Sequence, residues 1–264
     1  MDWWQALVLG IVQGLTEFLP VSSSGHLAIG KELLGIDLGE DLVFEVTVHA
    51  ATVLATIVVF RKQIWKLLRG LFRFGYEETD YVLKICTSMI PVFVVGVFFK
   101  DEVEALFSSL LVVGIALLAT AALLYFSDRT PVRKGSSEFM NGISWWQAFA
   151  VGLSQAFAVI PGLSRSGTTI STGLFCGVGR EVMAQFSFLM VLVPILGEAF
   201  LDLVGGDMAA SSVGLPALLT GFVAAFASGL FACKVMIAIV KRAELKWFAL
   251  YCAVLGLVVT IFSF

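Results

Sequence analysis

Long apolar stretches separated by short polar ones run along most of this sequence. Six stretches are long and hydrophobic enough to cross a membrane, for which a helix needs about 20 residues. They cover residues 43–60, 82–99, 107–126, 182–203, 213–240 and 247–264. Because their apolar residues are continuous and do not alternate with polar ones, we expect membrane-spanning α-helices and not a β-barrel.

Two further apolar segments, residues 2–34 and 144–178, are interrupted in the middle. The first breaks at residues 20–25 (PVSSSG) and the second at residues 161–167 (PGLSRSG). Each is too short for two complete crossings, and its middle is too polar for the hydrocarbon core. We therefore predict two re-entrant helical hairpins, each of which enters and leaves the membrane on the same side.

The composition agrees with an all-α polytopic membrane protein. The chain is 59% hydrophobic and 14% charged, whereas soluble domains are nearer half apolar and a quarter charged. The net charge of -3 gives no support for nucleic-acid binding. The four cysteines lie singly in apolar segments without metal-type spacing, so we interpret them as packing residues. Because no basic stretch precedes the first apolar segment, we expect no cleaved signal peptide.

The charged residues predict an orientation, since basic residues collect on cytoplasmic loops. Basic clusters lie at residues 61–73, 129–134 and 241–246, and acidic clusters lie at 101–104 and 202–207. With six spans, all basic clusters fall on one side and both acidic clusters on the other. The first hairpin then opens to the outside and the second to the cytoplasm, and both termini lie outside. Six tryptophans fit interfacial anchors: Trp3, Trp4, Trp65, Trp145, Trp146 and Trp247.

The two interrupted segments are copies of each other. Residues 3–6 (WWQA) recur at 145–148, and Ser24-Gly25 recurs as Ser166-Gly167. Two further matches keep the same offset, Gly10 with Gly152 and Gln13 with Gln155. Such self-similarity at a fixed offset indicates an internal repeat.

Each copy of the repeat holds one hairpin followed by three spans. We therefore divide the single membrane domain, 1–264, into a first repeat at 1–127 and a second at 143–264. The odd number of crossings between equivalent elements turns the second copy upside down. In inverted-repeat folds, broken helices from both halves meet near the midplane around a shared site.

The two breaks carry unusual polar groups for membrane-embedded sequence. The first holds Glu17, the serines at 22–24 and His26, and the second holds Arg165. An ionisable residue inside a span is a functional candidate by default, because its burial is costly. Helix N-termini after the Ser/Gly turns, together with the fork of N–H groups on Arg165, suit phosphate oxygens. A serine beside a histidine can act as a nucleophile, and Glu17 could orient the histidine, act as a base or hold a divalent cation.

Structural roles compete with these interpretations. Gly10, Gly14 and Gly152 are typical of close helix packing, and capping of a helix after Pro20 would explain at least one of the serines. A lone buried histidine is more often structural, but together with Glu17 and Arg165 we interpret His26 as functional.

Other ionisable residues have open or structural interpretations. Glu45 and His49 share a helix face and could reach the pocket, although Glu45 could equally mark the outer membrane interface. Glu198 and Lys234 lie near span ends, where their stems extend along apolar surface to the interface.

Motifs in both breaks resemble those of the bacterial undecaprenyl-diphosphatase family associated with bacitracin resistance. They are QGLTE at 13–17, PVSSSGH at 20–26 and PGLSRSGT at 161–168. The likeness extends over essentially the whole chain and includes FEV at 44–46 and residues 181–188.

The resemblance implies removal of the terminal phosphate from undecaprenyl diphosphate, which recycles the lipid carrier for peptidoglycan synthesis. It also implies a site on the outer face of the bacterial plasma membrane. Carried over by position, the catalytic residues are Glu17, Ser23, His26 and Arg165. The substrate-binding positions are Gln13, Ser22, Ser24, Gly25, Ser164, Ser166, Gly167 and Thr168.

The resemblance further implies a divalent cation, Mg²⁺ or Ca²⁺. Some members have a second glutamate where this chain has Gln13, so we assign the metal position to Glu17, with substrate oxygens and water completing the shell. The expected partners are a polyprenyl diphosphate and membrane lipids, without nucleic acid. A homodimer is compatible with the sequence, which does not determine the oligomeric state.

Our hypothesis is that Arg165 and loop amides bind the diphosphate while Ser23, aided by His26, attacks the terminal phosphorus. Direct attack by water stays open. The rival function is a polyprenyl-phosphate flippase, because inverted repeats and broken helices are common in transporters. A purely structural subunit would leave Arg165 and Glu17 unexplained.

Overall fold

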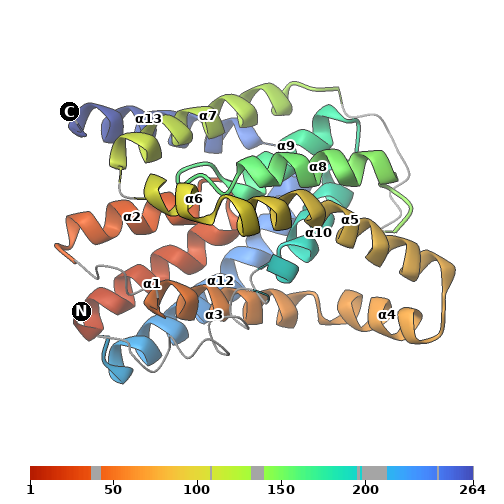
Figure 1. Cartoon of the computed structure of the whole chain (residues 1–264), viewed down its shortest axis with the longest axis horizontal. Helices are drawn as coiled ribbons and strands as arrows, with labels where there is room; N and C mark the ends of the chain where they lie inside the picture. The colour runs from red at the N-terminus through yellow and green to blue at the C-terminus, as the bar shows by residue number, and fades with distance from the viewer. Residues whose placement is uncertain are drawn as a thin grey trace.

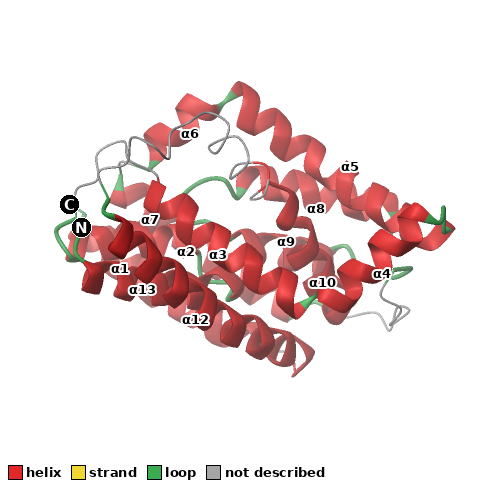
Figure 2. Ribbon diagram, turned by 90° about the horizontal axis from the view of Figure 1, so that it is seen from below, coloured by secondary structure: helices red, strands yellow, loops and turns green. Residues whose placement is uncertain are grey.

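The computed structural model describes residues 1–36, 43–107, 109–131, 140–194, 197, 213–242 and 244–263, and every regular element in these ranges is a helix (Figures 1 and 2). The helices are α1 (Trp3–Phe18), α2 (Ser23–Leu33), α3 (Val43–Val59), α4 (Arg61–Phe72), α5 (Tyr76–Phe98), α6 (Lys100–Leu106), α7 (Leu110–Asp128), α8 (Trp145–Phe157), α9 (Arg165–Phe175), α10 (Arg180–Met190), α12 (Leu215–Arg242) and α13 (Leu245–Phe262).

Several helices can cross a membrane, which confirms a polytopic all-α membrane protein. Among the described residues, α5, α7, α12 and α13 are long and apolar enough, and α3 with α4 forms a fifth candidate that bends by 78°. The predicted span at 182–203 is helical at α10, up to Met190. Most of its remainder, with Glu198 and the acidic cluster at 202–207, lies outside the described residues, so the arrangement of six spans stays a prediction.

The first basic cluster is a helix and not the loop that its charge suggested. Residues 61–72 form α4, which bends sharply away from α3. Lys62, Lys66 and Arg69 share one side of this helix, whereas Leu67 on the other side is buried. An amphipathic helix therefore satisfies the same charges, because it packs one apolar side and leaves the basic side exposed.

Both interrupted segments form two helices joined by a short break, as predicted. Equivalent glutamines close the two hairpins: the Gln5 side chain donates to the Leu34 carbonyl at 3.2 Å, and Gln147 donates to the Cys176 carbonyl at 2.9 Å. Each also accepts from the backbone N–H that precedes its helix, at 2.8 Å in both cases. The repeated WWQA sequence thus marks a contact between the start of one helix and the end of its partner.

Each hairpin packs against a helix from the other half of the chain. The first hairpin packs through α1 against α12, the second packs through α8 against α5, and α7 packs against α13. Glycines permit the close approach that the sequence predicted. A Cβ atom on Gly10 would lie 2.5 Å from the Gly221 carbonyl oxygen, and one on Gly152 would lie 2.1 Å from that of Ser88. Gly14 is equally tight, at 2.4 Å from the Ala225 carbonyl oxygen.

The hairpins extend from opposite ends of the molecule and meet near its middle. In Figure 1, α1 and α2 lie on the left, at the end that holds the N-terminus, and α8 and α9 lie further to the right. Both termini lie at one end of the molecule in Figures 1 and 2. The position of each half in the bilayer stays a prediction.

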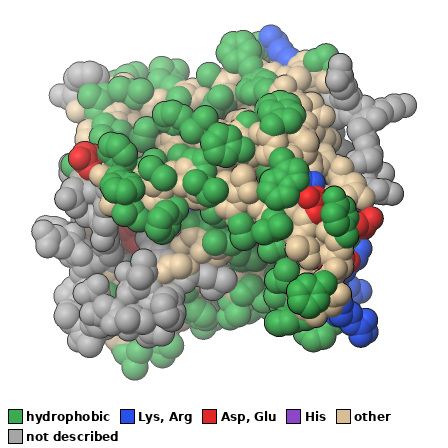
Figure 3. All heavy atoms as spheres, turned by 45° about the vertical axis from the view of Figure 1, so that its right-hand side comes forward, with side chains coloured by type: hydrophobic (Ala, Val, Ile, Leu, Met, Phe, Trp, Pro, Cys, Tyr) green, Lys and Arg blue, Asp and Glu red, His purple; other side chains and the backbone are tan. Residues whose placement is uncertain are grey.

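The surface is largely apolar, as a membrane environment requires. Hydrophobic side chains cover the middle of the face in Figure 3, with charged groups near its edges. All six tryptophans are exposed, which agrees with interfacial anchoring. Cys233 and Cys252 are buried as expected and Cys176 is partly buried, but Cys86 is exposed, so the packing interpretation is wrong for Cys86. Lys234 is exposed on α12.

Candidate active site

The breaks of the two hairpins touch each other. The Ser166 hydroxyl donates to the Leu19 carbonyl at 3.2 Å. A Cβ atom on Gly25 would lie 3.1 Å from the Gly162 Cα, and one on Gly167 would lie 3.4 Å from the Pro20 Cβ. Ser166 and Leu19 are 147 residues apart in the sequence. Two distant segments therefore form one local structure.

Equivalent serines cap the helices that follow the two breaks. The Ser22 hydroxyl accepts from the Gly25 N–H at 3.3 Å, and the Ser164 hydroxyl accepts from the Gly167 N–H at 3.1 Å. This confirms that one serine of the first cluster is an N-cap. In both breaks the capping hydroxyl also lies 3.3 Å from the hydroxyl two residues later, on Ser24 or Ser166.

Thr120 of α7 holds the second break in place, a role that the sequence analysis missed. Its hydroxyl donates to the Gly162 carbonyl at 3.2 Å and accepts from the Ser164 N–H at 3.0 Å. Gly162 has φ +91. It also lies so close to α7 that a Cβ atom would be 2.4 Å from the Val113 carbonyl oxygen. Only glycine fits both conditions.

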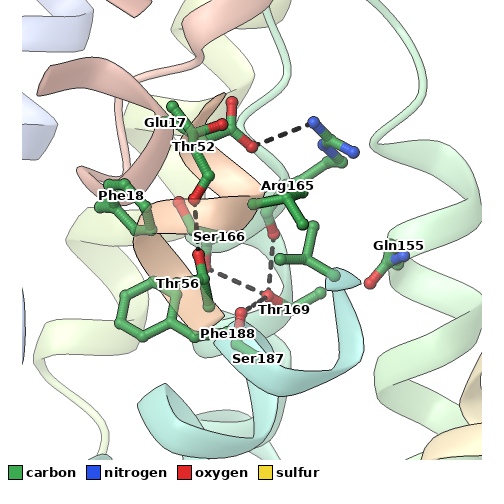
Figure 4. Close-up of a pocket in the computed structure, with 12 residues that line it drawn as sticks. Glu17, Phe18, Thr52, Thr56, Gln155, Arg165, Ser166, Thr169, Ser187 and Phe188 are labelled. Atoms are coloured by element: carbon green, nitrogen blue, oxygen red, sulfur yellow. Dashed lines mark hydrogen bonds and ion pairs between the residues drawn. The ribbon is translucent and has the colours of Figure 1, made fainter. Parts of the chain in front are cut away.

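Glu17, at the end of α1, is the centre of the site (Figure 4). Its Oε1 accepts from Arg165 Nη2 at 3.1 Å. Its Oε2 accepts from the Ser23 hydroxyl at 2.6 Å and from the Gln13 amide at 2.9 Å. His49 Nε2 lies 3.7 Å from the same oxygen. The side chain of Glu17 is only 7% exposed, so these partners compensate for the loss of water around a buried carboxylate.

Beside this ion pair lies a polar pocket, which we call the serine chamber. Its lining residues are Thr16, Glu17, Ser22, Ser23, Ser24, Leu163, Ser164, Arg165 and Ser166. The first two helical N–H groups of α2 and of α9 have no protein acceptor within the described chain; they belong to Ser23, Ser24, Arg165 and Ser166. Two helix N-termini, a guanidinium and several hydroxyls thus converge on one space, a combination that suits phosphate oxygens.

The predicted metal position fits a cation only together with substrate. Glu17 is the one carboxylate in the serine chamber, and the described residues contain no group of three or more His, Cys, Asp or Glu side chains that could hold a metal ion. The neighbouring donors are serine hydroxyls. Hard oxygen donors and a single carboxylate match Mg²⁺ or Ca²⁺ that completes its shell with phosphate oxygens and water.

The two histidines lie differently from the arrangement that the sequence suggested. His26 Nδ1 lies 2.7 Å from the Ser22 carbonyl oxygen and Nε2 lies 2.6 Å from the Tyr251 hydroxyl. Since a carbonyl only accepts, Nδ1 carries the proton. In the described structure the His26 ring forms no hydrogen bond or ion pair with Ser23 or Glu17. The imidazole nearest Glu17 belongs to His49, whose place in the site the sequence had left open.

Glu45 and the remaining predicted residues have supporting positions. Glu45 forms an ion pair with Lys31 of α2 and does not line the serine chamber. Gln13 is fully buried and holds Glu17 through its amide. Gly25 and Gly167 lie where the two hairpin breaks touch each other. Thr168 is buried without a hydrogen-bond partner for its hydroxyl and lines neither of the two pockets at the site.

Comparison with known proteins places the whole chain in one group. Residues 6–258 match the family described as "Bacitracin resistance protein BacA". A protein from Parabacteroides distasonis is 57% identical over 263 residues, which cover 98% of this chain and 97% of the relative. One from Bacteroides fragilis is 54% identical over 268 residues, and one from Bacteroides thetaiotaomicron is 53% identical over 266, each with at least 99% of both chains covered. All three relatives are named "Undecaprenyl-diphosphatase".

Proposed function

Because this chain belongs to the bacitracin resistance protein BacA family, we propose that it is a membrane-embedded phosphatase of undecaprenyl diphosphate. Its reaction releases undecaprenyl phosphate and inorganic phosphate, and so returns the lipid carrier to peptidoglycan synthesis. The observation that carries the proposal is the contact between Arg165 and Glu17, which joins the two hairpin breaks around the serine chamber.

The serine chamber binds the diphosphate. The free N–H groups at the starts of α2 and α9 and the unused N–H groups of Arg165 donate to phosphate oxygens. The bonds at Gln13, Thr120 and the two capping serines hold these donors in place before substrate arrives. The isoprenoid tail lies along the apolar helices. Such preorganised donors stabilise the charge that builds on the transferring phosphoryl group.

Ser23 is the nucleophile and Glu17 is its proton acceptor. The Ser23 hydroxyl already donates to Glu17 Oε2 at 2.6 Å. As the serine oxygen bonds to the terminal phosphorus, Glu17 takes the hydroxyl proton, and the bond from that phosphorus to the bridging oxygen breaks. Undecaprenyl phosphate leaves with the bonding electrons. Water then attacks phosphoserine, which releases inorganic phosphate and returns the serine oxygen to its protonated form.

Glu17, with the Ser23 hydroxyl, would hold the divalent cation that the family resemblance implies. When bound, the cation offsets the negative charge of the diphosphate and of the leaving phosphate. His26 positions the first break, because its Nδ1–H holds the Ser22 carbonyl. Ser22 has φ +69, a conformation that costs energy for any residue other than glycine, so this bond helps to maintain it.

The test is phosphate release from undecaprenyl diphosphate by the purified protein. Ser23→Ala abolishes turnover in the covalent mechanism, by about 10³-fold or more. The matched control is Ser154→Ala, since Ser154 bonds only its own helix at Val151 and lines neither pocket. Near-normal turnover by Ser23→Ala would show that water attacks directly.

A polyprenyl-phosphate flippase is the alternative function for the same pocket. It predicts tight binding of the lipid without phosphate release, even with the cation present.

The reaction site opens to the outer face of the bacterial plasma membrane in our proposal, since the first hairpin is predicted to open on the side opposite the basic clusters.

A further inference from the structure

The last helix of the described chain contacts the first hairpin break. The Tyr251 hydroxyl of α13 lies 2.6 Å from His26 Nε2, and the two rings stack with their centroids 5.6 Å apart and their planes at 11°. The next residue, Cys252, is buried and has its Sγ 3.8 Å from the Pro20 carbonyl oxygen. Since α13 belongs to the second repeat, the first break is held from the opposite half, as Thr120 of α7 holds the second break.

The partners of the His26 ring determine where its proton lies. Nδ1 carries the proton, because it faces the Ser22 carbonyl at 2.7 Å. In the neutral imidazole, Nε2 then has a lone pair and can only accept. Among the described residues, the hydrogen-bond partner of Nε2 is the Tyr251 hydroxyl, which therefore donates. Tyr251 thus stabilises the tautomer in which His26 donates to the backbone.

The Ser22 carbonyl in turn determines where the Ser23 N–H points. A peptide unit is planar and trans, so its C=O and N–H bonds point in opposite directions. The Ser22 carbonyl accepts from His26 Nδ1 at 2.7 Å and from the His26 backbone N–H at 3.2 Å. The Ser23 N–H therefore points away from these donors, and it has no protein acceptor within the described chain. Two donors on the carbonyl also polarise the peptide unit, which strengthens its N–H as a donor.

The backbone at Ser22 needs this support. Its φ of +69 is unfavourable for a residue with a side chain. If the imidazole turned or exchanged its tautomer, the Ser22 carbonyl would lose the Nδ1–H, and the peptide unit before Ser23 could rotate. Both the N–H and the hydroxyl of Ser23 would then lose their fixed direction at the edge of the serine chamber.

We propose that Tyr251 is a positioning residue of the reaction, which acts through His26 to direct the Ser23 N–H and hydroxyl at the phosphate. The inference rests on the proposed function for the reaction itself. Tyr251 lines neither of the two pockets at the site, so its effect on the phosphate is indirect. Donors held in place matter most for the charge that builds on the transferring phosphoryl group, so the effect of Tyr251 falls on kcat.

The first test replaces the hydroxyl and keeps the aromatic ring. Tyr251→Phe lowers kcat for phosphate release from undecaprenyl diphosphate about tenfold, as for the loss of one hydrogen bond to the positioned group, and leaves KM unchanged. The matched control is Tyr125→Phe on α7, which keeps the wild-type kcat. Tyr125 is 41% exposed against 46% for Tyr251, lies against Arg129 and lines neither pocket. A wild-type kcat in Tyr251→Phe, or a higher KM at unchanged kcat, overturns the proposal.

The second test asks whether Tyr251 acts through His26. In the His26→Ala background, Tyr251→Phe lowers kcat no further, because the group that it positions is gone. The same tenfold loss in that background would show that Tyr251 acts independently of His26, and would overturn the proposal.

The third test needs no substrate. The chain has two histidines, so nitrogen NMR of histidine-labelled protein gives few imidazole signals, and His26→Gln assigns those of His26. The neutral wild-type ring carries its proton on Nδ1. Tyr251→Phe moves the Nε2 signal to the position of a nitrogen without a hydrogen bond, and Tyr125→Phe does not.

Two NMR results overturn the proposal: an Nε2 signal that Tyr251→Phe leaves unchanged, and a wild-type His26 with its proton on Nε2. A wild-type chain that releases no phosphate would instead reject the proposed function, and with it any role of Tyr251 in catalysis, whereas the NMR result for the hydrogen bond would stand.

Discussion

At the residue scale, Glu17 explains why so many polar groups lie at membrane depth. A carboxylate there is stable only with compensating partners. The structure supplies Arg165, Ser23 and Gln13 as donors and places His49 within 3.7 Å. Three of these four partners come from helices other than α1, so the position of Glu17 depends on correct assembly of the hairpins and α3.

Replacement of Arg165 by lysine keeps the charge but removes the fork of donors. A single ammonium group cannot hold Glu17 and also present the same fork of donors to phosphate oxygens in the serine chamber. We expect Arg165→Lys to lower kcat/KM for undecaprenyl diphosphate by about 10²–10³-fold. Thermal unfolding should change little, since the buried carboxylate still has a cation beside it. Activity within threefold of wild type would contradict the role of the fork.

Removal of divalent cations should abolish hydrolysis, because the negative charge of the diphosphate is then no longer offset. Glu17 is the one carboxylate that lines the serine chamber and so the expected ligand of the cation. The predicted shell needs phosphate oxygens, so the affinity for Mg²⁺ or Ca²⁺ should be weak alone and rise when substrate is present. Phosphate release after treatment with a chelator, followed by titration with each cation, measures this. Full activity in excess chelator would exclude the metal role of Glu17.

At the element scale, the hairpins were predictable because local signals repeat. The proline and Ser/Gly breaks, the WWQA starts and the small residues at 10, 14 and 152 all have the expected structural counterparts. The fold of α4 was not predicted, because its basic residues exclude a span but not an interfacial helix. The hydrogen bonds between Thr120 and the second break were also not predicted. A lone threonine in an apolar stretch gives no signal of its distant partners.

Close packing between α8 and α5 predicts a specific sensitivity to added volume. Gly152→Ala should lower the free energy of unfolding by about 1–3 kcal/mol, because the new methyl group meets the Ser88 backbone. Gly96 of α5 is the control, since a Cβ atom there meets nothing within 4 Å. Gly96→Ala should leave the thermal midpoint unchanged or raise it. Equal midpoints for the two variants would show that the helix contact is looser than described.

At the scale of the whole molecule, the repeat predicted which segments meet but not every role within the site. The sequence identified Glu17, Ser23 and Arg165, which the structure brings together. It did not determine which histidine approaches Glu17, because the directions of side chains on α2 and α3 depend on helix rotation. It also could not show the second pocket beside the Glu17–Arg165 ion pair, whose lining comes from five helices.

The predicted orientation can be tested at the C-terminus. Both termini lie at one end of the molecule (Figure 1), and the basic clusters predict that this end is outside. Alkaline phosphatase fused after residue 264 should be active in intact cells, and a green fluorescent protein fused there should be dark. The opposite pattern would reverse the orientation of both hairpins and place the serine chamber on the cytoplasmic side.

The measurement that tests the account most directly is a double-mutant cycle across the two hairpins. We compare kcat/KM for undecaprenyl diphosphate in wild type, Glu17→Asp, Arg165→Lys and the double variant. If the two residues form one site, their effects on kcat/KM are strongly non-additive. The double variant then has nearly the same kcat/KM as the less active of the two single variants. If the losses multiply, Glu17 and Arg165 act independently, and the claim that the two hairpins build one active site is contradicted.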